Sequence, residues 1–379
     1  MMEYVNLGDV ATYINGYAFK PEQRGKKGLP IIRIQDLNGN SHDLGFFDGE
    51  YPKQVEINAG DILISWSGSL GVYKWNKGKA LLNQHIFKVL FNKIKIDKEY
   101  FCYAMKNSLS VMSQQSHGAT MKHITKKDFD KVLIPYPSLN TQRKIAQKLN
   151  IVTELIVFYE TELSLMEQLI KARFVEMFGD PATPGDKFKT CKLGEVADVK
   201  SSHRVFSTEF VNEGVPFYRG TEISVLASGQ QPEDPYRISM DHYLKIANDD
   251  SKPIRGDLLL PSICNKGQVW MVNTDEPFYY KDGRVLCISP HRSIFDSRYL
   301  QFYMKMRTEA EYPKLGSGST FAEFKIFQLK ELLVDMPPMN AQKSFCLFAD
   351  QVDKSREEVK KSLEKTQQLY DSLMQEYFG

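Results

Sequence analysis

Few residues of this chain have the types and spacing that catalysis requires. The sequence contains no GxxxxGK[ST] phosphate loop, no HExxH zinc motif and no GxSxG nucleophile elbow. His117 and His123 have no cysteine or second ligand pair beside them, so we predict no metal site there. Asp61 and Asp257 each precede an apolar run, where a carboxylate is expected to cap a turn. The sequence therefore predicts no catalytic centre and no metal or cofactor site.

The chemistry that the sequence does support is binding to nucleic acid. Hydroxyls, backbone amides and lysines suit phosphate oxygens, and they gather in segments 116–127 and 316–325. Arginine, glutamine and carboxylate side chains can read base edges, and they occur at 33–36 and 219–222. The structural alternatives are a solvated loop for the first two segments and ion pairs for the last two. The predicted DNA-binding residues are Arg33, Gln35, Asp36, Ser67, Ser69, Asn83, Gln84, Lys122, His123, Lys126, Arg219, Thr221, Asn265, Lys266, Arg284, Ser317, Ser319 and Lys325.

These segments occur in pairs because the chain repeats a long module. Gly118-Ala119-Thr120 recurs 200 residues later as Gly318-Ser319-Thr320. Leu7–Ala11 (LGDVA) matches Leu193–Ala197 (LGEVA) at an offset of 186, so the second copy carries 14 additional residues (200 − 186). The copies are far longer than solenoid repeats of roughly 20–50 residues. A duplicated module with unequal loops suggests two domains that read different half-sites.

Each copy begins with short apolar runs separated by turn residues, which predicts β-strands. The expected strands lie at 30–34, 61–65 and 85–90 in the first copy, and at 216–219, 257–261 and 284–288 in the second. A short helix is expected after them, near 98–108 and 297–308. The pattern predicts an α+β domain in each copy.

Each copy ends in a long helix with a heptad seam. Apolar residues spaced by four and three run from Ile145 to Met177, and the same register runs from Phe345 to Tyr377. Asn140 and Asn340 stand where helix N-caps are expected. A narrow seam favours pairing of the two helices, and the order of the segments makes that pairing antiparallel. The alternative is that each helix packs on the sheet of its own domain.

The predicted fold is α+β: two pseudo-twofold-related α/β domains separated by an antiparallel coiled coil of two long helices. The predicted boundaries are residues 1–140 for the first domain, 141–179 for the first helix, 180–340 for the second domain and 341–379 for the second helix.

Composition is that of a globular protein that stays in a reducing compartment. No apolar run approaches the roughly 18–20 residues of a membrane span, and the start lacks a secretory signal pattern. Five scattered cysteines predict neither disulfides nor zinc, which favours the cytoplasm. The net charge is only +2, although residues 1–140 carry 18 basic and 13 acidic side chains, or +5 (18 − 13). The charge permits DNA binding without requiring it.

The ordered set of segments, given twice, resembles the specificity subunit of a Type I restriction–modification system over essentially the whole chain. The resemblance rests on the LGDVA and LGEVA openings, the Gly60–Ser65 (GDILIS) and Gly256–Pro261 (GDLLLP) strands, the asparagine- and glutamine-containing starts of the long helices, and the EMFG and EYFG ends. One departure is that Thr141 and Ala341 stand where family members often have glutamate.

The resemblance implies two target-recognition domains, each reading half of a bipartite double-stranded DNA site, with the paired helices setting the spacer. It also implies that two S-adenosylmethionine-dependent methyltransferase subunits dock on those helices and that motor-nuclease subunits complete the complex. The chain itself would hold no catalytic centre or cofactor. The alternatives are a specificity subunit of a related Type II-like system, a two-headed protein scaffold that does not bind DNA, and an enzyme with an unrecognised site.

Overall fold

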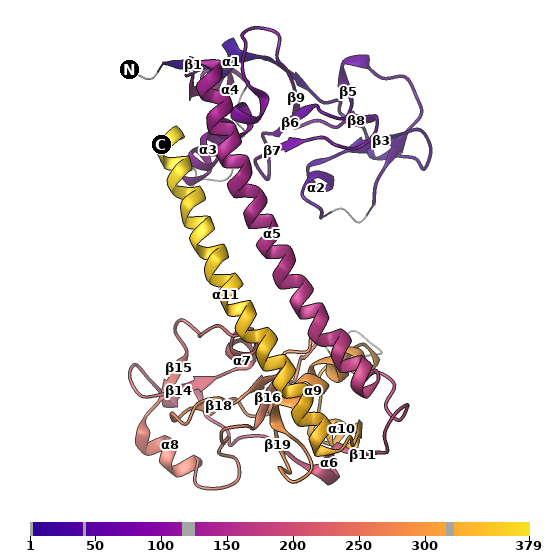
Figure 1. The fold of residues 1–379 in the computed structure, drawn as a ribbon, viewed down its shortest axis with the longest axis vertical. Helices are drawn as coiled ribbons and strands as arrows, with labels where there is room; N and C mark the ends of the chain where they lie inside the picture. The colour runs from indigo at the N-terminus through magenta and orange to yellow at the C-terminus, as the bar shows by residue number, and fades with distance from the viewer. Residues whose placement is uncertain (1–2, 41–42, 116–125, 316–321) are drawn as a thin grey trace. The chain divides into compact units, whose positions relative to one another are not determined.

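The computed structural model describes residues 3–40, 43–115, 126–315 and 322–379. They divide into two compact units (Figure 1). Unit 1 comprises Met1–Thr161 together with Lys360–Gly379, and unit 2 comprises Glu162–Val359. The two units contain the same order of main elements, as the repeated sequence predicted, and each is an α/β domain.

The described residues of unit 1 form two four-stranded sheets and one strand pair, in the orders β2-β9-β6-β7, β4-β3-β8-β5 and β1-β10. Helix α3 contacts β7 and β10, and buried residues of the helix share a core with Ile62, Ile64 and Phe87. The elements are β1 (Tyr4–Asn6), α1 (Leu7–Val10), β2 (Thr12–Asn15), β3 (Leu29–Ile32), α2 (Ile34–Leu37), β4 (Phe46–Phe47), β5 (Glu56–Ile57), β6 (Ile62–Ser65), β7 (Gly71–Lys74), β8 (Ala80–Leu82), β9 (Ile86–Leu90), α3 (Lys98–Gln115), α4 (Lys126–Asp130) and β10 (Leu133–Pro135).

Unit 2 repeats this plan, with sheets in the orders β12-β19-β16-β17 and β13-β15-β14-β18 and the strand pair β11-β20. Strand β16 begins 65 residues after Leu193 (258 − 193), whereas β6 begins 55 residues after Leu7 (62 − 7). Ten of the 14 additional residues therefore precede β16, in the region that contains α8. The elements are β11 (Thr190–Lys192), α6 (Leu193–Val196), β12 (Ala197–Lys200), β13 (Phe210–Val211), β14 (Val215–Tyr218), α7 (Gly220–Ala227), β15 (Tyr236–Ile238), α8 (Met240–Ile246), β16 (Leu258–Pro261), β17 (Trp270–Met271), β18 (Tyr279–Tyr280), β19 (Val285–Pro290), α9 (Ser297–Glu311), α10 (Ile326–Glu331) and β20 (Leu333–Asp335).

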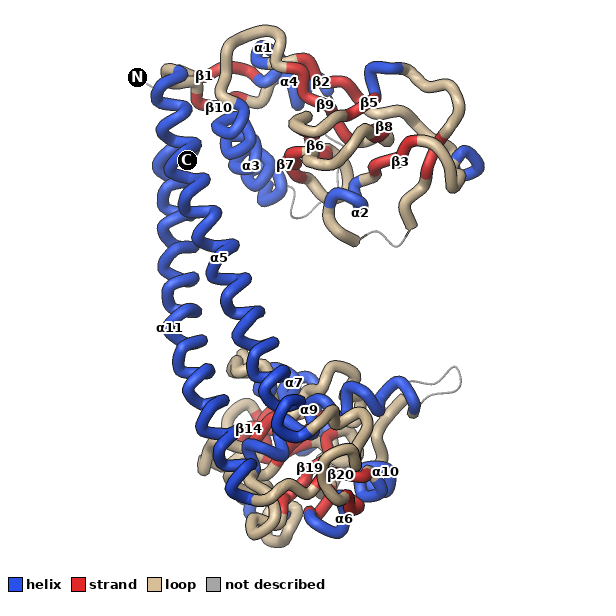
Figure 2. Tube along the Cα trace, turned by 45° about the vertical axis from the view of Figure 1, so that its right-hand side comes forward, coloured by secondary structure: helices blue, strands red, loops and turns tan. Residues whose placement is uncertain are grey.

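The two long helices, α5 (Leu139–Phe178) and α11 (Met339–Phe378), are paired, as the seam predicted (Figures 1 and 2). In unit 1 the first part of α5 packs beside the last part of α11, and the Lys148 ammonium donates to the Tyr377 hydroxyl at 3.3 Å. In unit 2 the last part of α5 packs beside the first part of α11, where the Phe174 and Phe345 rings lie 5.0 Å apart. The direction is antiparallel in both units, and every predicted seam position is buried or half-buried.

The predicted N-caps of these helices are wrong by two residues. Both helices begin before the asparagines, so Asn140 and Asn340 lie inside the first turn. In the first helix the Ser138 hydroxyl accepts a hydrogen bond from the Thr141 amide at 3.3 Å, and the Ser138 carbonyl accepts one from the Gln142 amide at 2.9 Å. The serine hydroxyl thus does what the asparagine side chain was expected to do.

A buried glutamine explains why the start of the long helix recurs in both copies. Gln142 is fully buried; its side-chain oxygen accepts from the Asp97 amide at 2.9 Å and its nitrogen donates to the Pro137 carbonyl at 2.8 Å. Gln342 makes the same pair of bonds, to the Asp296 amide at 2.9 Å and the Pro337 carbonyl at 2.9 Å. Each glutamine therefore joins the start of its long helix to the start of the shorter helix in the same unit.

Asp61 and Asp257 cap turns, as the sequence predicted, but their surroundings differ. Asp61 accepts from the Asn58 amide at 2.8 Å and forms an ion pair with Lys88 at 3.1 Å. Asp257 accepts from the Ile254 amide at 3.0 Å, and its side chain is only 1 % exposed. Burial raises the pKa of Asp257 above the ordinary carboxyl range.

We expect Asp257→Asn to become more stable relative to the natural protein as the pH rises. The folded state holds the Asp257 proton to higher pH than the unfolded chain does, so stability falls from about pH 4 upward, toward the raised pKa. Thermal unfolding of both proteins between pH 4 and 8 measures this. Asp61→Asn is the matched control: it leaves Lys88 without its carboxylate and should destabilise by about 1–3 kcal/mol at neutral pH. An Asp257→Asn stability difference that does not change with pH would contradict the prediction.

Candidate nucleic-acid interface

The ends of several strands meet at one place in each unit. In unit 1, β2 and β6 run antiparallel to β9, and β3 runs parallel to β8. Ser65 is paired with Ile86 and Ile32 with Leu82, so the ends of β3, β6 and β8 lie at the start of β9. Unit 2 has the same arrangement of β12, β14, β16 and β18 around the start of β19. We call the loops that follow these strands, with the loop preceding β9 or β19, the strand-end loops.

In unit 1 the strand-end loops bring together Asn15, Trp66 and His85. The Trp66 ring stacks on Phe87 with centroids 5.5 Å apart and meets the His85 ring edge-on at 5.0 Å. The Trp66 indole nitrogen donates to the Asn15 side-chain oxygen at 3.3 Å. His85 is the one non-glycine residue with positive φ (71°) in the part of the chain that the structure describes. A left-handed histidine is strained, and strain of this kind is typical of functional loops.

Two predicted base-reading arginines, Arg33 and Arg219, each form an ion pair with a carboxylate three residues later in the sequence. The Arg33 Nε donates to Asp36 at 3.1 Å, and this pair is mostly buried, with side chains 15 % and 6 % exposed. Gln35 lies beside the Arg33 guanidinium. The ion pair that the sequence left as an alternative is thus present, and it closes the first turn of α2.

The corresponding pair in unit 2 is more open. The Arg219 guanidinium donates to Glu222 at 2.6 Å, lies 4.6 Å from the centroid of the Tyr236 ring, and is 45 % exposed. Burial alone would raise the pKa of Glu222, but hydrogen bonds from Arg219 outweigh it and hold that pKa below the ordinary range. The Thr221 hydroxyl also donates to Glu222, at 3.0 Å. Arg219 keeps enough exposed surface to contact a ligand, whereas Arg33 has little.

Unit 2 also gathers cations at its strand-end loops. Glu323 pairs with Arg284 and, at 2.8 Å, with Lys325, and both cations remain more than half exposed. The Phe324 amide donates to the Ser262 carbonyl at 2.8 Å, which holds this segment against the loop after β16. Arg204, in the loop after β12, pairs with Asp282 at 3.1 Å. Two predicted residues, Arg284 and Lys325, are therefore neighbours through Glu323.

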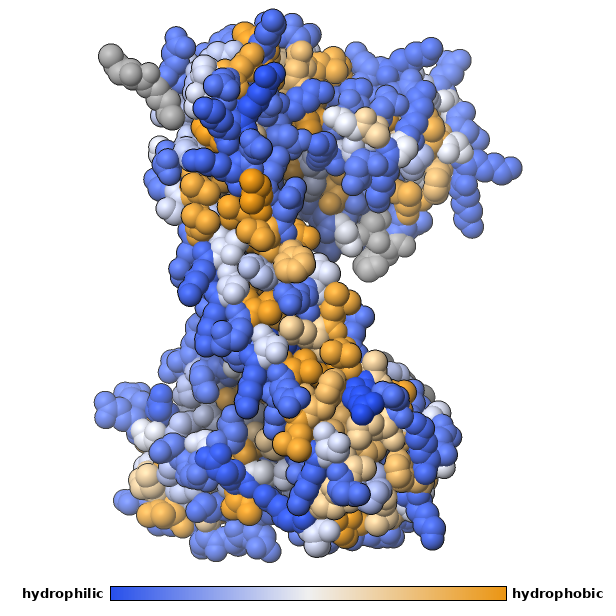
Figure 3. All heavy atoms as spheres, viewed as in Figure 1, coloured by the Kyte–Doolittle hydropathy of each residue, from blue (hydrophilic) through white to orange (hydrophobic). Residues whose placement is uncertain are grey.

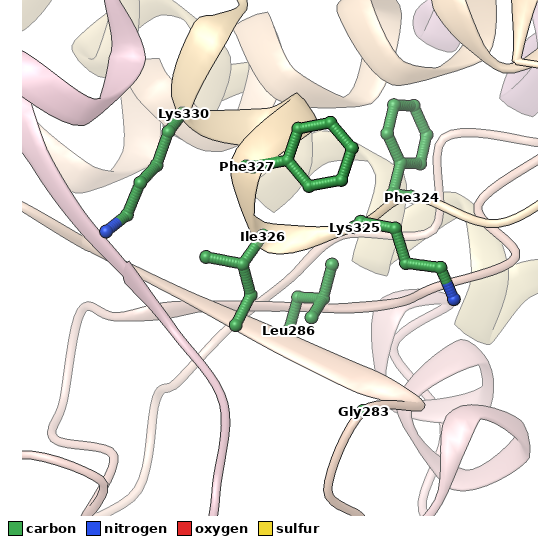
Figure 4. Close-up of a pocket in the computed structure, with 7 residues that line it drawn as sticks. All are labelled: Gly283, Leu286, Phe324, Lys325, Ile326, Phe327 and Lys330. Atoms are coloured by element: carbon green, nitrogen blue, oxygen red, sulfur yellow. The ribbon is translucent and has the colours of Figure 1, made fainter.

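A hollow of about 440 Å³ is lined by Lys325 and, on its other side, by Lys330 (Figure 4). Leu286 and Ile326 form its floor, and the rings of Phe324 and Phe327 stand on one side of it. Phe327 is 66 % exposed. The residue 200 positions earlier, in α4 of unit 1, is Lys127. The same place in the two units thus presents an aromatic ring in one and an ammonium in the other.

The remaining predicted residues are partly outside the described ranges. Lys122, His123, Ser317 and Ser319 fall in segments that the structure does not describe. Lys126 pairs with Asp130 at 2.7 Å in α4. In the loop after β16, the Asn265 oxygen accepts from Gln268 at 3.3 Å and the Lys266 amide donates to the Gln268 oxygen at 3.0 Å. The Ser69 carbonyl accepts from the Ser65 hydroxyl at 2.5 Å, and Ser67, Asn83 and Gln84 also lie in strand-end loops of unit 1.

The residues predicted from the sequence did not include Asn15, Trp66, His85 or Arg204. Each follows or precedes a strand whose counterpart exists in the other copy, so an alignment of the two copies by strand ends would have pointed to them. Arg204 is the clearest omission, because its side chain is 67 % exposed.

No group of three or more histidine, cysteine, aspartate or glutamate side chains among the described residues could hold a metal ion. Burial raises the pKa of the Cys264 thiol to about 11 and that of Cys287 to about 12, so neither forms a thiolate readily at neutral pH.

No helix within the described ranges is long and apolar enough to cross a membrane.

Comparison with known proteins identifies the family of this chain. The family described as "Type I restriction modification DNA specificity domain" matches residues 1–167 and 185–368. The chain belongs to this family. It is a Type I restriction–modification specificity subunit, as the sequence resemblance predicted.

Relatives of this specificity subunit cover nearly its whole length. The EcoBI specificity subunit of Escherichia coli is 24 % identical over 99 % of this chain and 85 % of its own length. The MjaVIII specificity subunit of Methanocaldococcus jannaschii is 24 % identical over 97 % of this chain and 91 % of its own. The S subunit of a Type I system from M. genitalium has the same fold, with a TM-score of 0.56 at 15 % identity, covering 100 % of this chain and 96 % of that one.

Proposed function

We propose that each unit of this specificity subunit reads one half of a bipartite double-stranded DNA site. The observation that carries the proposal is that the strand-end loops occupy the same position in both units but carry different side chains. Unit 1 presents Trp66 and His85, beside Asn15 at the end of β2, whereas unit 2 presents Arg284 and Arg204, with Lys325 joined to Arg284 through Glu323. Equal scaffolds with unequal contact groups suit a target whose two halves differ.

The paired helices are proposed to set the spacer between the half-sites and to dock two methyltransferase subunits. In unit 1, α5 exposes Ile151, Leu155 and Phe158, which are 53 %, 41 % and 59 % exposed. Their spacing of four and three places them on one face of the helix. Apolar atoms gather along the surface formed by α5 (Figure 3). This face lies outside the seam with α11 and suits a partner helix.

In this proposal the docked subunits carry out methylation, and this chain determines which DNA sequence they methylate. The docked methyltransferases would bind S-adenosylmethionine and flip the target base out of the duplex. Motor-nuclease subunits would complete the restriction complex. A DNA-free scaffold, in contrast, would show no dependence of DNA affinity on salt concentration.

The test is a methylome measured with and without this chain, in cells that carry its methyltransferase partner. We expect one bipartite motif that disappears when the chain is absent. Arg284→Ala combined with Lys325→Ala should lower the methylation rate of the motif by about 5–150-fold, corresponding to about 1–3 kcal/mol. Any loss of base specificity should be confined to one half of the motif, and the bases required in the other half should not change. Lys245→Gln, an exposed lysine on α8 of the same unit, is the control for loss of one charge. Loss of both halves by the double variant, or a motif that persists without the chain, would contradict the proposal.

A further inference from the structure

Unit 2 contains a groove whose role the strand-end loops do not explain. Its volume is about 540 Å³, and it is lined by the last part of α5, the end of α7, the loop after β16, helix α9 and one residue of α11. Four cationic side chains line it, namely Lys171, Lys266, Lys305 and Arg356. Two carboxylates line it, Glu167 and Glu309, so the lining carries a net charge of +2 (4 − 2).

Lys305 is the central cation of this groove. It projects from α9, is half-buried, and its ammonium lies 5.9 Å from the centroid of the Phe302 ring. Within the described part of the chain its ammonium forms no ion pair with a carboxylate. Burial lowers the pKa of Lys305, and the nearby charge of Arg298 lowers it further. A bound anion would relieve both effects.

Arg356 supplies a second unsatisfied donor. Its terminal nitrogen pairs with Asp353 at 3.1 Å, and Asp353 is shared with Arg298. The Arg356 Nε is buried and has no hydrogen-bond partner among the described residues. A buried guanidinium nitrogen without an acceptor is costly, because it has lost water and gained nothing in exchange. The groove is thus lined by the Lys305 ammonium, which has no carboxylate partner within the described ranges, and by Arg356, whose guanidinium is held by Asp353.

We infer that this groove binds a phosphate group. A phosphate offers several acceptor oxygens at once, and can therefore accept from ammonium groups on α9 and on the loop after β16 together, namely Lys305 and Lys266. Its negative charge matches the excess of cations in the lining. The phosphate belongs either to the DNA backbone or to a free phosphate ion. Lys266 lies in a strand-end loop, so the DNA source rests on the proposed function, whereas the free ion does not.

The first experiment tests free phosphate on the full chain. Thermal unfolding is measured in chloride and in inorganic phosphate at equal ionic strength and pH. If the ion is the ligand, phosphate raises the midpoint of the natural protein and of Lys245→Gln by more than it raises that of Lys305→Gln, because a ligand adds stability only to a folded state that binds it. The rise that remains in Lys305→Gln is the general stabilisation that phosphate gives to any folded protein. Lys266→Gln is tested beside it, since this exposed side chain can be changed without disturbing the core.

The second experiment tests the DNA backbone, with the chain in complex with its methyltransferase partner. If a DNA phosphate is the ligand, Lys305→Gln weakens binding to target and unrelated duplexes by the same factor. It also lowers the slope of log affinity against log salt by about one. Lys245→Gln should leave the slope unchanged.

The two experiments together decide the inference. A smaller phosphate-induced rise of the unfolding midpoint in Lys305→Gln and Lys266→Gln supports a site for the free ion, and weaker DNA binding with a smaller salt slope in both variants supports a site for a DNA phosphate. If the variants match the natural protein in both, the inference is overturned. If the natural complex binds no DNA at all, the proposed function fails, and the thermal experiment alone then decides whether the groove binds phosphate.

Discussion

Replacing Phe174 by alanine is expected to destabilise unit 2 by about 3–5 kcal/mol, the usual cost of removing a buried phenylalanine. The side chain is fully buried at the end of α5. Its ring lies 5.0 Å from that of Phe178, 5.4 Å from that of Tyr299 and 5.0 Å from that of Phe345. The substitution leaves a cavity at the point where both long helices meet the core of the unit, and the aromatic neighbours cannot close it.

Urea unfolding of the full chain measures this effect. Phe158→Ala is the matched control, because it removes the same ring from the same helix at a position that is 59 % exposed. It should cost at most about 0.5 kcal/mol in stability. Equal losses for the two variants would mean that the packing around Phe174 contributes little.

Adding one heptad to both long helices is expected to lengthen the spacer of the DNA target while leaving both half-sites unchanged. The insertions would lie between Tyr159 and Leu163 in α5 and between Val359 and Leu363 in α11, so that the seam stays in register. Seven residues add about 10 Å of helix, which corresponds to about three base pairs.

Methylome sequencing of cells that carry the lengthened chain and the partner methyltransferase reads the spacer directly. A two-residue insertion at the same places is the control, since it turns the helix faces about 160° out of register and should abolish methylation. Methylation of the original spacer by the heptad variant would count against the role of the helices as the spacer.

The long helices were predictable because their signal is local and repeated. The apolar seam from Ile145 to Met177 can be read directly from the sequence, and a period of 3.5 residues over this length predicts a coiled-coil helix. The polar seam positions Arg356 and Thr366 are half-buried, in keeping with the same register. The N-caps were less predictable, because Ser138 and Asn140 are both good capping residues and only the backbone decides between them.

The sheets could not be derived from the sequence to the same extent. Their strands are two to six residues long and pair across long separations, as Ile32 does with Leu82. The strand-end loops come together only through that pairing. Nothing in the sequence therefore indicates that Trp66 and His85 are neighbours. Arg33 shows a different limit: its residue type suits both base reading and an ion pair, and only the structure shows that the ion pair with Asp36 is present.

The two units differ in how their parts are spread along the chain, and this affects the order in which they can fold during synthesis. Unit 2 is continuous, whereas unit 1 needs residues 360–379, among them Phe378, which is mostly buried against Tyr100. At about 5–20 residues per second, a ribosome makes the missing piece roughly 10–40 s after residue 161. The N-terminal unit would therefore wait, incompletely packed, while the later unit finishes first, and a chaperone that protects nascent chains would be needed most for the part made earliest.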